Sequence, residues 1–140
     1  MKIDDIKTDL VARNSTFVSA LSTVGVPLVA LTAAMMFTRD YQEPTGKVCV
    51  FIEAKPEEAE EITPSFSIVT MPVEITVFTQ GASESVLREQ AANYAQAIRN
   101  CLKLNPYYFE MTGRDDFDGV EGKPDIKATK ISLTFKYEEA

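Results

Sequence analysis

The stretch from Met71 to Leu104 constrains the fold most, because it encodes a strand, a tight turn and a long helix in succession. Val73, Ile75 and Val77 alternate with Glu74 and Thr76, which predicts a strand with one apolar face. Gly81 then breaks the alternation, and Ser83 stands where a helix N-cap is expected. From about residue 84 to 104, apolar side chains recur at helical spacing: Leu87, Ala91, Tyr94, Ala95, Ile98 and Leu102. A strand and a helix with matching apolar faces predict a layer of helix packed on a layer of sheet.

Further strands are predicted on both sides of this unit. Residues 48–52 are all apolar, which predicts a strand covered on both faces. Residues 65–70 predict a strand whose position near Pro72 allows a sheet edge or a bulge. Residues 107–111 predict a short apolar strand, and residues 130–137 alternate clearly enough to predict the closing strand.

Two charged segments are expected to be loops. Residues 55–61 (KPEEAEE) form an acidic link without a stable apolar face, which is typical of a solvated, mobile connection. Residues 113–125 combine glycine, aspartate and proline and predict a long loop before the closing strand.

The first forty residues are expected to be helical in short pieces. Ile3, Ile6 and Leu10 recur at helical spacing, Asn14 and Ser15 interrupt the pattern, and a second helix would follow before Gly25. The apolar run from residue 24 to 37 is too short to span a membrane and is interpreted as core. For residues 28–37 the composition leans towards helix, but periodicity leaves helix and strand both open.

Together these elements predict one domain over residues 1–140, with an N-terminal helical segment (1–40) and a sheet-plus-helix body (47–140). The expected class is α+β: a mostly antiparallel sheet, the helix of residues 84–104 packed on one face, and short N-terminal helices.

Charge and cysteine content narrow the classes of function. A formal net charge of −7 argues against a nucleic-acid-wrapping protein and against binding to an anionic membrane surface. The charged start of the chain argues against a secretory signal. Cys49 and Cys101 sit in apolar surroundings, so we expect buried thiols in a reducing compartment and no disulfide or metal site.

The sequence offers little material for catalysis. It contains no histidine, which removes the commonest general base and the histidine-dependent nucleophilic systems. Residues 116–119 (DFDG) copy part of a calcium-binding loop, but Arg114 stands where the first ligand belongs and no bidentate glutamate follows. We therefore predict no cofactor, no metal and no enzymatic activity.

The order of the elements nevertheless resembles one family. A helical start, a strand, an acidic link, VEITVFTQG leading into a helix that ends AQAIRNCL, an acidic glycine segment with FDGV, and a closing KATKISLTFKY are similar to the tail terminator (tail-completion, neck) proteins of long-tailed bacteriophages. The resemblance covers most of the chain from Val48 onward. It implies a virion structural protein of the tail or neck, made in the host bacterial cytoplasm.

The resemblance also implies partners. Such proteins form a hexameric ring that caps the tail tube and joins it to the head-side connector, while DNA passes through as cargo. A ring needs contact surfaces that close by rotation, and unpaired edges and long charged loops are candidates for them. The predicted contact residues are Glu57, Glu58, Glu60, Glu61, Phe66, Ile68, Asp115, Asp116, Phe117 and Asp118.

Two alternatives remain open at this point. The chain could be another phage tail ring component, such as a tube or connector subunit. It could also be a small cytosolic ligand-binding or enzyme-accessory domain that uses a crevice between sheet and helix.

Overall fold

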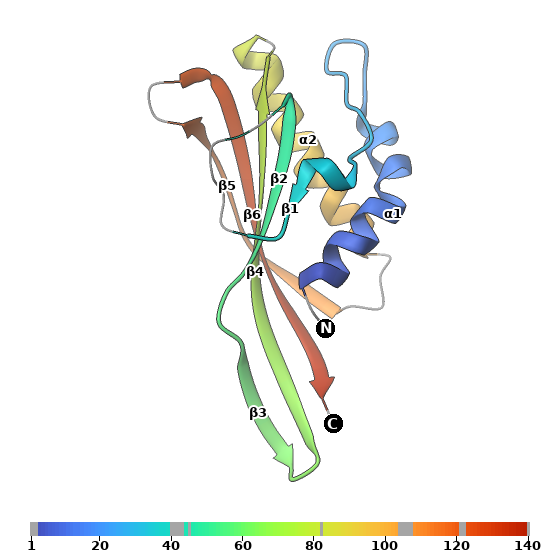
Figure 1. Cartoon of the computed structure of the whole chain (residues 1–140), viewed down its shortest axis with the longest axis vertical. Helices are drawn as coiled ribbons and strands as arrows, with labels where there is room; N and C mark the ends of the chain where they lie inside the picture. Colours follow the sequence, from blue (N-terminus) through green and yellow to red (C-terminus); the bar gives the residue numbers. More distant parts are fainter. Residues whose placement is uncertain are drawn as a thin grey trace.

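The computed structural model describes residues 3–39, 44, 46–81, 83–103, 108–120 and 123–139. Figure 1 shows the elements, which are α1 (Ile3–Leu21), the 3₁₀ helix η1 (Ala33–Met35), β1 (Met36–Phe37), β2 (Val48–Ala54), β3 (Glu58–Thr63), β4 (Phe66–Gln80), α2 (Glu84–Lys103), β5 (Tyr108–Val120) and β6 (Lys123–Glu139). The class is α+β, as predicted, with a six-stranded mixed sheet in the described part of the chain.

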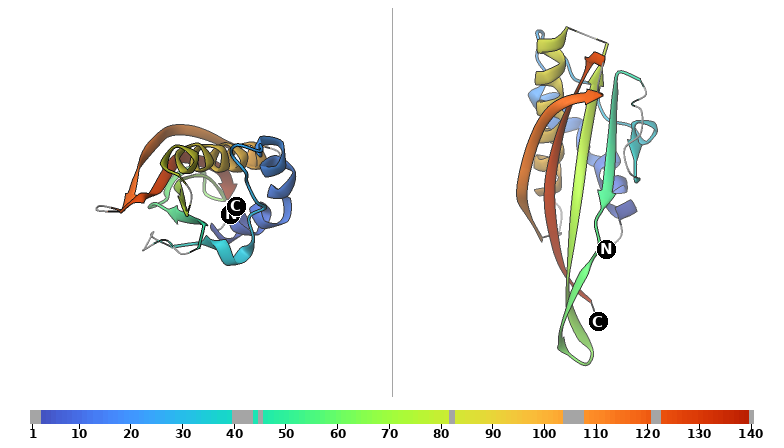
Figure 2. Two further views of the ribbon diagram at one scale, coloured as in Figure 1. Left: turned by 90° about the horizontal axis from the view of Figure 1, so that it is seen from above. Right: turned by 90° about the vertical axis from the view of Figure 1, so that its left-hand side faces the viewer.

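Two long strands form the spine of the sheet. β4 and β6 pair antiparallel along their whole shared length, from Ser67 opposite Glu139 to Gln80 opposite Ile126. The strand order is β1-β2-β4-β6-β5, and β3 pairs with the part of β4 that lies beyond β2. All pairs are antiparallel except β1 with β2. Seen from above, the strands curve around α2 (Figure 2).

The main core lies between the helices and one face of the sheet. The β4 residues Val73, Ile75 and Val77 are buried, as are all six residues of the predicted α2 stripe. The predicted helix of residues 84–104 is therefore confirmed as α2, with Leu104 itself outside the described residues. Gly81 has a φ of +91°, a backbone angle that favours glycine, so the predicted turn is also confirmed.

A second cluster occupies the opposite face of the sheet. It contains Cys49, Phe51, Phe78, Ile126 and Ala128, with Phe37 and Phe117 packed against it. β2 is thus buried on both faces over Val48–Ile52, as its sequence predicted. Both cysteines are buried and free of disulfides.

The prediction of two short N-terminal helices is wrong, because α1 runs unbroken through Asn14 and Ser15. Asn14 is buried, and its side-chain amide donates to the carbonyls of Leu10 (2.6 Å) and Leu31 (2.8 Å). Its side-chain oxygen accepts from the Leu31 backbone N–H at 2.8 Å. These tertiary hydrogen bonds satisfy a polar residue that would otherwise favour ending the helix.

Residues 28–37 are neither a buried helix nor a full strand. Residues 28–32 are extended without pairing, and only η1 and the two-residue β1 follow. Leu28, Leu31 and Met36 are buried, but Val24 and Val29 are exposed, so the run from residue 24 to 37 is core only in part. The extended backbone is held by side chains of α1 and α2, which sequence periodicity does not reveal.

Most of both segments predicted to be charged loops is strand, although residues 55–57 are outside any strand, as predicted, and residues 121–122 lie outside the described residues. Residues 58–63 form β3 on the edge of β4, and residues 113–120 belong to β5, which pairs with β6. The predicted strand at residues 107–111 is therefore only the start of β5 (Tyr107 lies outside the described residues), and the closing strand begins already at Lys123. The reason is that a neighbouring strand supplies hydrogen bonds to the backbone whatever the side chains are, while exposed edge positions tolerate charge.

Candidate functional site

The most prominent surface feature is a projecting arm, built from Glu57 and the strand β3 that follows it, residues 66–70 of β4 and residues 134–139 of β6. In Figure 1 it extends below the body of the molecule, beside the C-terminal end of the described chain. Glu58 lies opposite Thr70 and Glu60 opposite Ile68, and every residue of β3 is exposed. The arm is therefore a hydrogen-bonded extension of the sheet and not the mobile loop that the sequence predicted.

The arm is continuous with the body because β4 passes through Pro72 without a break. The Pro72 carbonyl accepts from the Lys55 backbone N–H at 2.8 Å. The nitrogen and the carbonyl of one strand residue point to the same side, so the Pro72 nitrogen also faces the gap between the end of β2 and the start of β3. A proline costs no ladder hydrogen bond at such a gap. Val69 and Met71, which precede Pro72 in β4, are buried, and they carry the core into the base of the arm.

Negative charge is concentrated on the arm. It carries one lysine, Lys136, and six glutamates: Glu57, Glu58, Glu60, Glu61, Glu138 and Glu139. This imbalance accounts for most of the net charge of −7 of the whole chain. Half-buried Ile68 and exposed Ile62 lie among these carboxylates, so the arm presents apolar side chains within an acidic surround.

The other predicted contact residues lie at the far end of the sheet. Asp115, Asp116, Phe117 and Asp118 are in β5 opposite residues 127–130 of β6, whereas the arm involves residues 134–139. The structure therefore separates the two predicted groups within one chain. It places Glu57, Glu58, Glu60, Glu61, Phe66 and Ile68 together on the arm.

Successive side chains of β5 point to opposite faces of the sheet, so the four predicted contact residues of β5 have different surroundings. Phe117 packs edge-on against Phe78, with ring centroids 6.1 Å apart, so it belongs to the core cluster of the opposite face. Asp116 accepts a hydrogen bond from the Thr129 hydroxyl at 2.6 Å. Asp115 is exposed and lies opposite Lys130. The three aspartates are all exposed, while Phe117 has a packing role.

Asp118 holds a buried lysine that the sequence reasoning did not single out. The side chain of Lys127 is 2% exposed, and its ammonium lies 2.7 Å from Asp118 Oδ1 and 3.0 Å from Glu84 Oε1. Arg88 also reaches Asp118, at 3.2 Å. The hydrogen bond to Asp118 raises the pKa of Lys127, and the same bond lowers the pKa of the Asp118 carboxyl.

This charged cluster ties three elements together, namely the first turn of α2, the end of β5 and β6. The sequence contained a signal for the burial of Lys127. Ile131, Leu133 and Phe135 occupy alternate positions on the helix-facing side of β6, and the same alternation towards the N-terminus puts Lys127 on that side. A charge on that side requires partners, and the partners come from elements distant in sequence.

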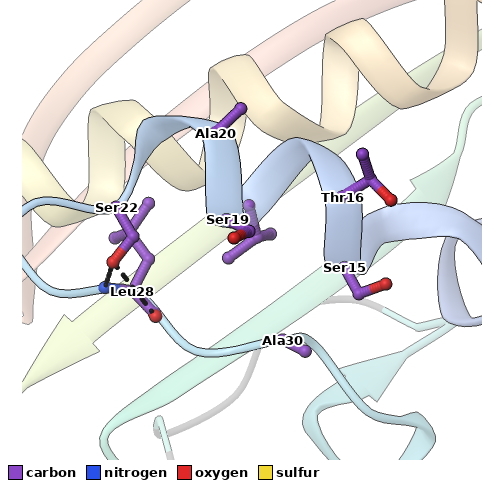
Figure 3. Close-up of a pocket in the computed structure, with 8 residues that line it drawn as sticks. Ser15, Thr16, Ser19, Ala20, Ser22, Leu28 and Ala30 are labelled. Atoms are coloured by element: carbon purple, nitrogen blue, oxygen red, sulfur yellow. Dashed lines mark hydrogen bonds between the residues drawn. The ribbon is translucent and has the colours of Figure 1, made fainter.

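A groove of about 730 Å³ runs between α1 and the extended segment that follows it (Figure 3). Its lining comprises Ser15, Thr16, Val18, Ser19, Ala20, Ser22, Leu28 and Ala30. The Ser22 hydroxyl accepts from the Leu28 backbone N–H at 2.9 Å, which fixes one wall. The groove offers hydroxyl groups and alkyl surface, and is suited to packing against another surface.

A smaller pocket of about 240 Å³ lies between Tyr94, Gln90 and Gln80. Three of its polar side chains are already engaged: Gln90 donates to the Pro27 carbonyl, and the Tyr94 hydroxyl accepts from the Val29 N–H at 2.9 Å. Gln80 donates to the Gly46 carbonyl. These groups hold backbone segments in place and do not converge on an open position.

No helix in the described part of the chain has the length and apolar character needed to cross a membrane.

The acidic stretch of residues 116–119 that partly copies a calcium loop lies in β5. The carboxylate of Asp116 accepts from Thr129, and the carboxylate of Asp118 accepts from Lys127.

Comparison with known proteins finds similarity among solved structures. No protein-family model matches the chain, and no curated protein matches it. Among solved structures, the fold is similar to that of a chain in the virion of a native gene transfer agent (GTA) particle, with a TM-score of 0.50. The match covers 95% of this chain and 97% of that chain at 15% sequence identity. The likeness therefore concerns the fold, over nearly the full length of both chains.

Proposed function

We propose that this chain is a structural subunit of a phage-like virion. The observation that carries the proposal is the end-to-end likeness in fold to a chain of the gene transfer agent virion, which leaves little of either chain unmatched. The surface agrees with such a role, because the described residues present a projecting arm and a long groove suited to protein contacts. On this proposal the chain acts by assembly and not by catalysis.

Within that class, we propose the tail terminator role, in which copies form a ring at the end of the tail tube and join it to the neck. The sequence resemblance supports this finer assignment, and a stiff arm that projects from a compact body is a suitable element for reaching an adjacent protein. The acidic arm would avoid holding passing DNA, because DNA binding depends on neutralising phosphates with basic side chains.

The assembly state of the purified protein tests the proposal. Native mass spectrometry and negative-stain imaging should show closed rings, with six copies expected from the family resemblance. Extended filaments would favour a tail tube subunit. A lone particle at every concentration would contradict the ring and favour a small ligand-binding or accessory domain.

The arm is proposed to contact an adjacent protein of the tail or neck through its acidic and apolar residues. Reversing two charges (Glu58→Lys with Glu60→Lys) should reduce joining of purified rings to tail tubes, because both side chains are exposed and their replacement leaves the β3–β4 pairing intact. Glu89→Lys, on the exposed side of α2, is the matched control. Equal joining by the arm variant and the control would remove the arm from the contact.

A further inference from the structure

One long stretch of the chain carries no charge. From Asn14 to Thr38 the sequence contains no acidic or basic residue, although a quarter of the whole chain is charged. The structure folds this stretch into the second half of α1, the turn after it, and the extended segment that runs back beside α1. We call this surface the uncharged face. Its exposed residues are Ser15, Thr16, Ser19, Ala20, Thr23, Val24, Gly25, Pro27, Val29, Ala30, Thr32, Ala33 and Ala34.

The uncharged face contains an apolar projection. Val24 is fully exposed at the tip of a turn, and Val29 is 56% exposed. These are two of the three large apolar residues that are exposed in the described part of the chain. The turn is ordered, because Thr23 and Val26 exchange two hydrogen bonds, of 3.1 Å between their backbones and 3.0 Å to the Thr23 hydroxyl. An apolar side chain held at a fixed tip is typical of a contact residue.

The same face contains a depression. The groove of about 730 Å³ is lined by residues of the uncharged face, and Ser22 and Leu28 of its wall directly flank the turn that carries Val24 (Figure 3). The small side chains of Ser15, Ser19 and Ala30 leave its mouth open. The projection and the depression are two different sites, both formed by uncharged residues, so the projection of one copy can enter the depression of the next, as a closed ring requires.

Charge identifies the partner that fits this face. Two copies that meet through their arms place glutamates against glutamates, and β5 also carries more acidic than basic residues, so those contacts are repulsive. At the uncharged face two copies can approach without like-charge repulsion and without burying an unpaired charge. Depletion of charge is also what distinguishes the centre of protein interfaces from other surface.

We propose that the uncharged face is the contact between copies of this chain, with the Val24 turn of one copy seated in the groove of the next. This deepens the proposed function, on which it rests, by naming the surface that joins the subunits of the ring. It also assigns the arm to a different partner, since contact between the arms of two copies would place glutamates against glutamates.

The first test adds a charge to the face. Ser19→Glu should weaken self-association roughly tenfold or more, measured by analytical ultracentrifugation, because it buries a carboxylate in the contact. Ser85→Glu is the matched control, since it places the same change at an exposed helical serine outside the face. Circular dichroism checks that both variants remain folded, and Val24→Glu provides a second variant outside any helix.

The second test locates the two halves of the contact. Because both native cysteines are buried, Val24→Cys and Ser19→Cys each introduce a single accessible thiol. Mixing the two variants with a short bismaleimide should give a cross-linked pair that is absent from either variant alone. If mixing gives no pair beyond those of the separate variants, the seating of Val24 in the groove is wrong.

The outcomes separate this inference from the function on which it rests. If Ser19→Glu and Val24→Glu still form rings, the inference about the uncharged face is wrong and the proposed ring is unaffected. If these variants form rings that no longer bind tail tubes, the uncharged face contacts the tube, and the inference is again wrong. Wild-type chains that never associate would overturn the inference and the proposed ring together.

Discussion

At the residue scale, a few buried polar side chains connect segments that are distant in sequence. Asn14 hydrogen-bonds to Leu31, and the Tyr94 hydroxyl to Val29, so α1 and α2 together fix the extended segment between α1 and β1. Burial is the main cause of the raised pKa of Tyr94, which keeps its hydroxyl neutral. Such bonds order a segment that has little regular secondary structure of its own.

Replacing Asn14 should therefore destabilise the protein. Asn14→Ala leaves the Leu31 N–H and carbonyl without their side-chain partner in a buried site, and a loss of about 1–3 kcal/mol in the free energy of unfolding is expected. Urea unfolding followed by circular dichroism measures it. Ser15→Ala, one residue further along α1 and exposed, is the control and should change stability little. Equal stability of the two variants would contradict the role given to Asn14.

Cys101 should be unreactive while the chain is folded. Burial, with a smaller contribution from Asp9, raises the pKa of the Cys101 thiol to about 11, so roughly one thiol in a thousand is ionised at pH 8. Titration with a chromogenic disulfide should detect no native thiol, whereas Ser85→Cys, exposed on α2, should react at once. Above pH 9.0 the unfolded chain loses this proton first, so this thiol lowers stability as pH rises towards about 11.

At the element scale, pairing between strands overrides the local preference for loops. β3 and the second half of β5 consist largely of residues that disfavour strands, yet each lies along a long neighbour, β4 or β6, that offers a complete row of backbone partners. The end of β5 is further secured by the charged cluster of Asp118, Lys127, Glu84 and Arg88.

Neutralising Asp118 should loosen the end of β5. Asp118→Asn leaves the buried Lys127 ammonium with Glu84 as its remaining carboxylate, and faster hydrogen exchange over residues 115–120 is expected at pH 7. Because the folded pKa of Asp118 is lowered, its contribution is complete above the ordinary value of 3.8 and disappears as the pH falls through the folded value. The difference between wild type and variant should therefore vanish in strong acid.

Asp115→Asn is the control for that experiment, because Asp115 is exposed and lies on the other face of β5. Exchange in this variant should match the wild type. If Asp118→Asn also matches the wild type at pH 7, the cluster does not hold β5, and strand pairing alone secures it.

At the scale of the whole molecule, charge and shape are divided between regions. The arm holds most of the net negative charge at one end, and the uncharged face covers the outer side of α1 and the segment beside it. A chain arranged in this way can use different surfaces for different partners, which is what the proposed ring would require.

The same distribution predicts weak interaction with nucleic acid. With a net charge of −7 and an acidic arm, the chain should not retard double-stranded DNA at physiological salt, since few phosphates can be neutralised. Fluorescence anisotropy with a labelled duplex measures this, and Glu58→Lys with Glu60→Lys should remain close to the wild type. Saturable binding that weakens steeply with added salt would contradict the prediction.

Much of the fold could be predicted from the sequence, because periodicity is a local property. The apolar stripe of α2, the alternation of Val73, Ile75 and Val77, and the continuous apolar run of β2 each identified an element and its buried side. The burial of both cysteines followed from the same patterns. The ten predicted contact residues, in contrast, were chosen as loop and edge positions, and the structure puts most of them in paired strands.

What the tertiary structure alone decided is where backbone groups find partners across long sequence distances. Asn14 continues a helix because Leu31 is nearby, Glu58–Thr63 is a strand because β4 extends past β2, and Lys127 is buried because two carboxylates from other elements meet it. The sequence by itself determined which side chains need to leave water and at what spacing. The tertiary structure determined which polar groups could be buried beside them, because a hydrogen bond depends on position in space and not on position in the chain.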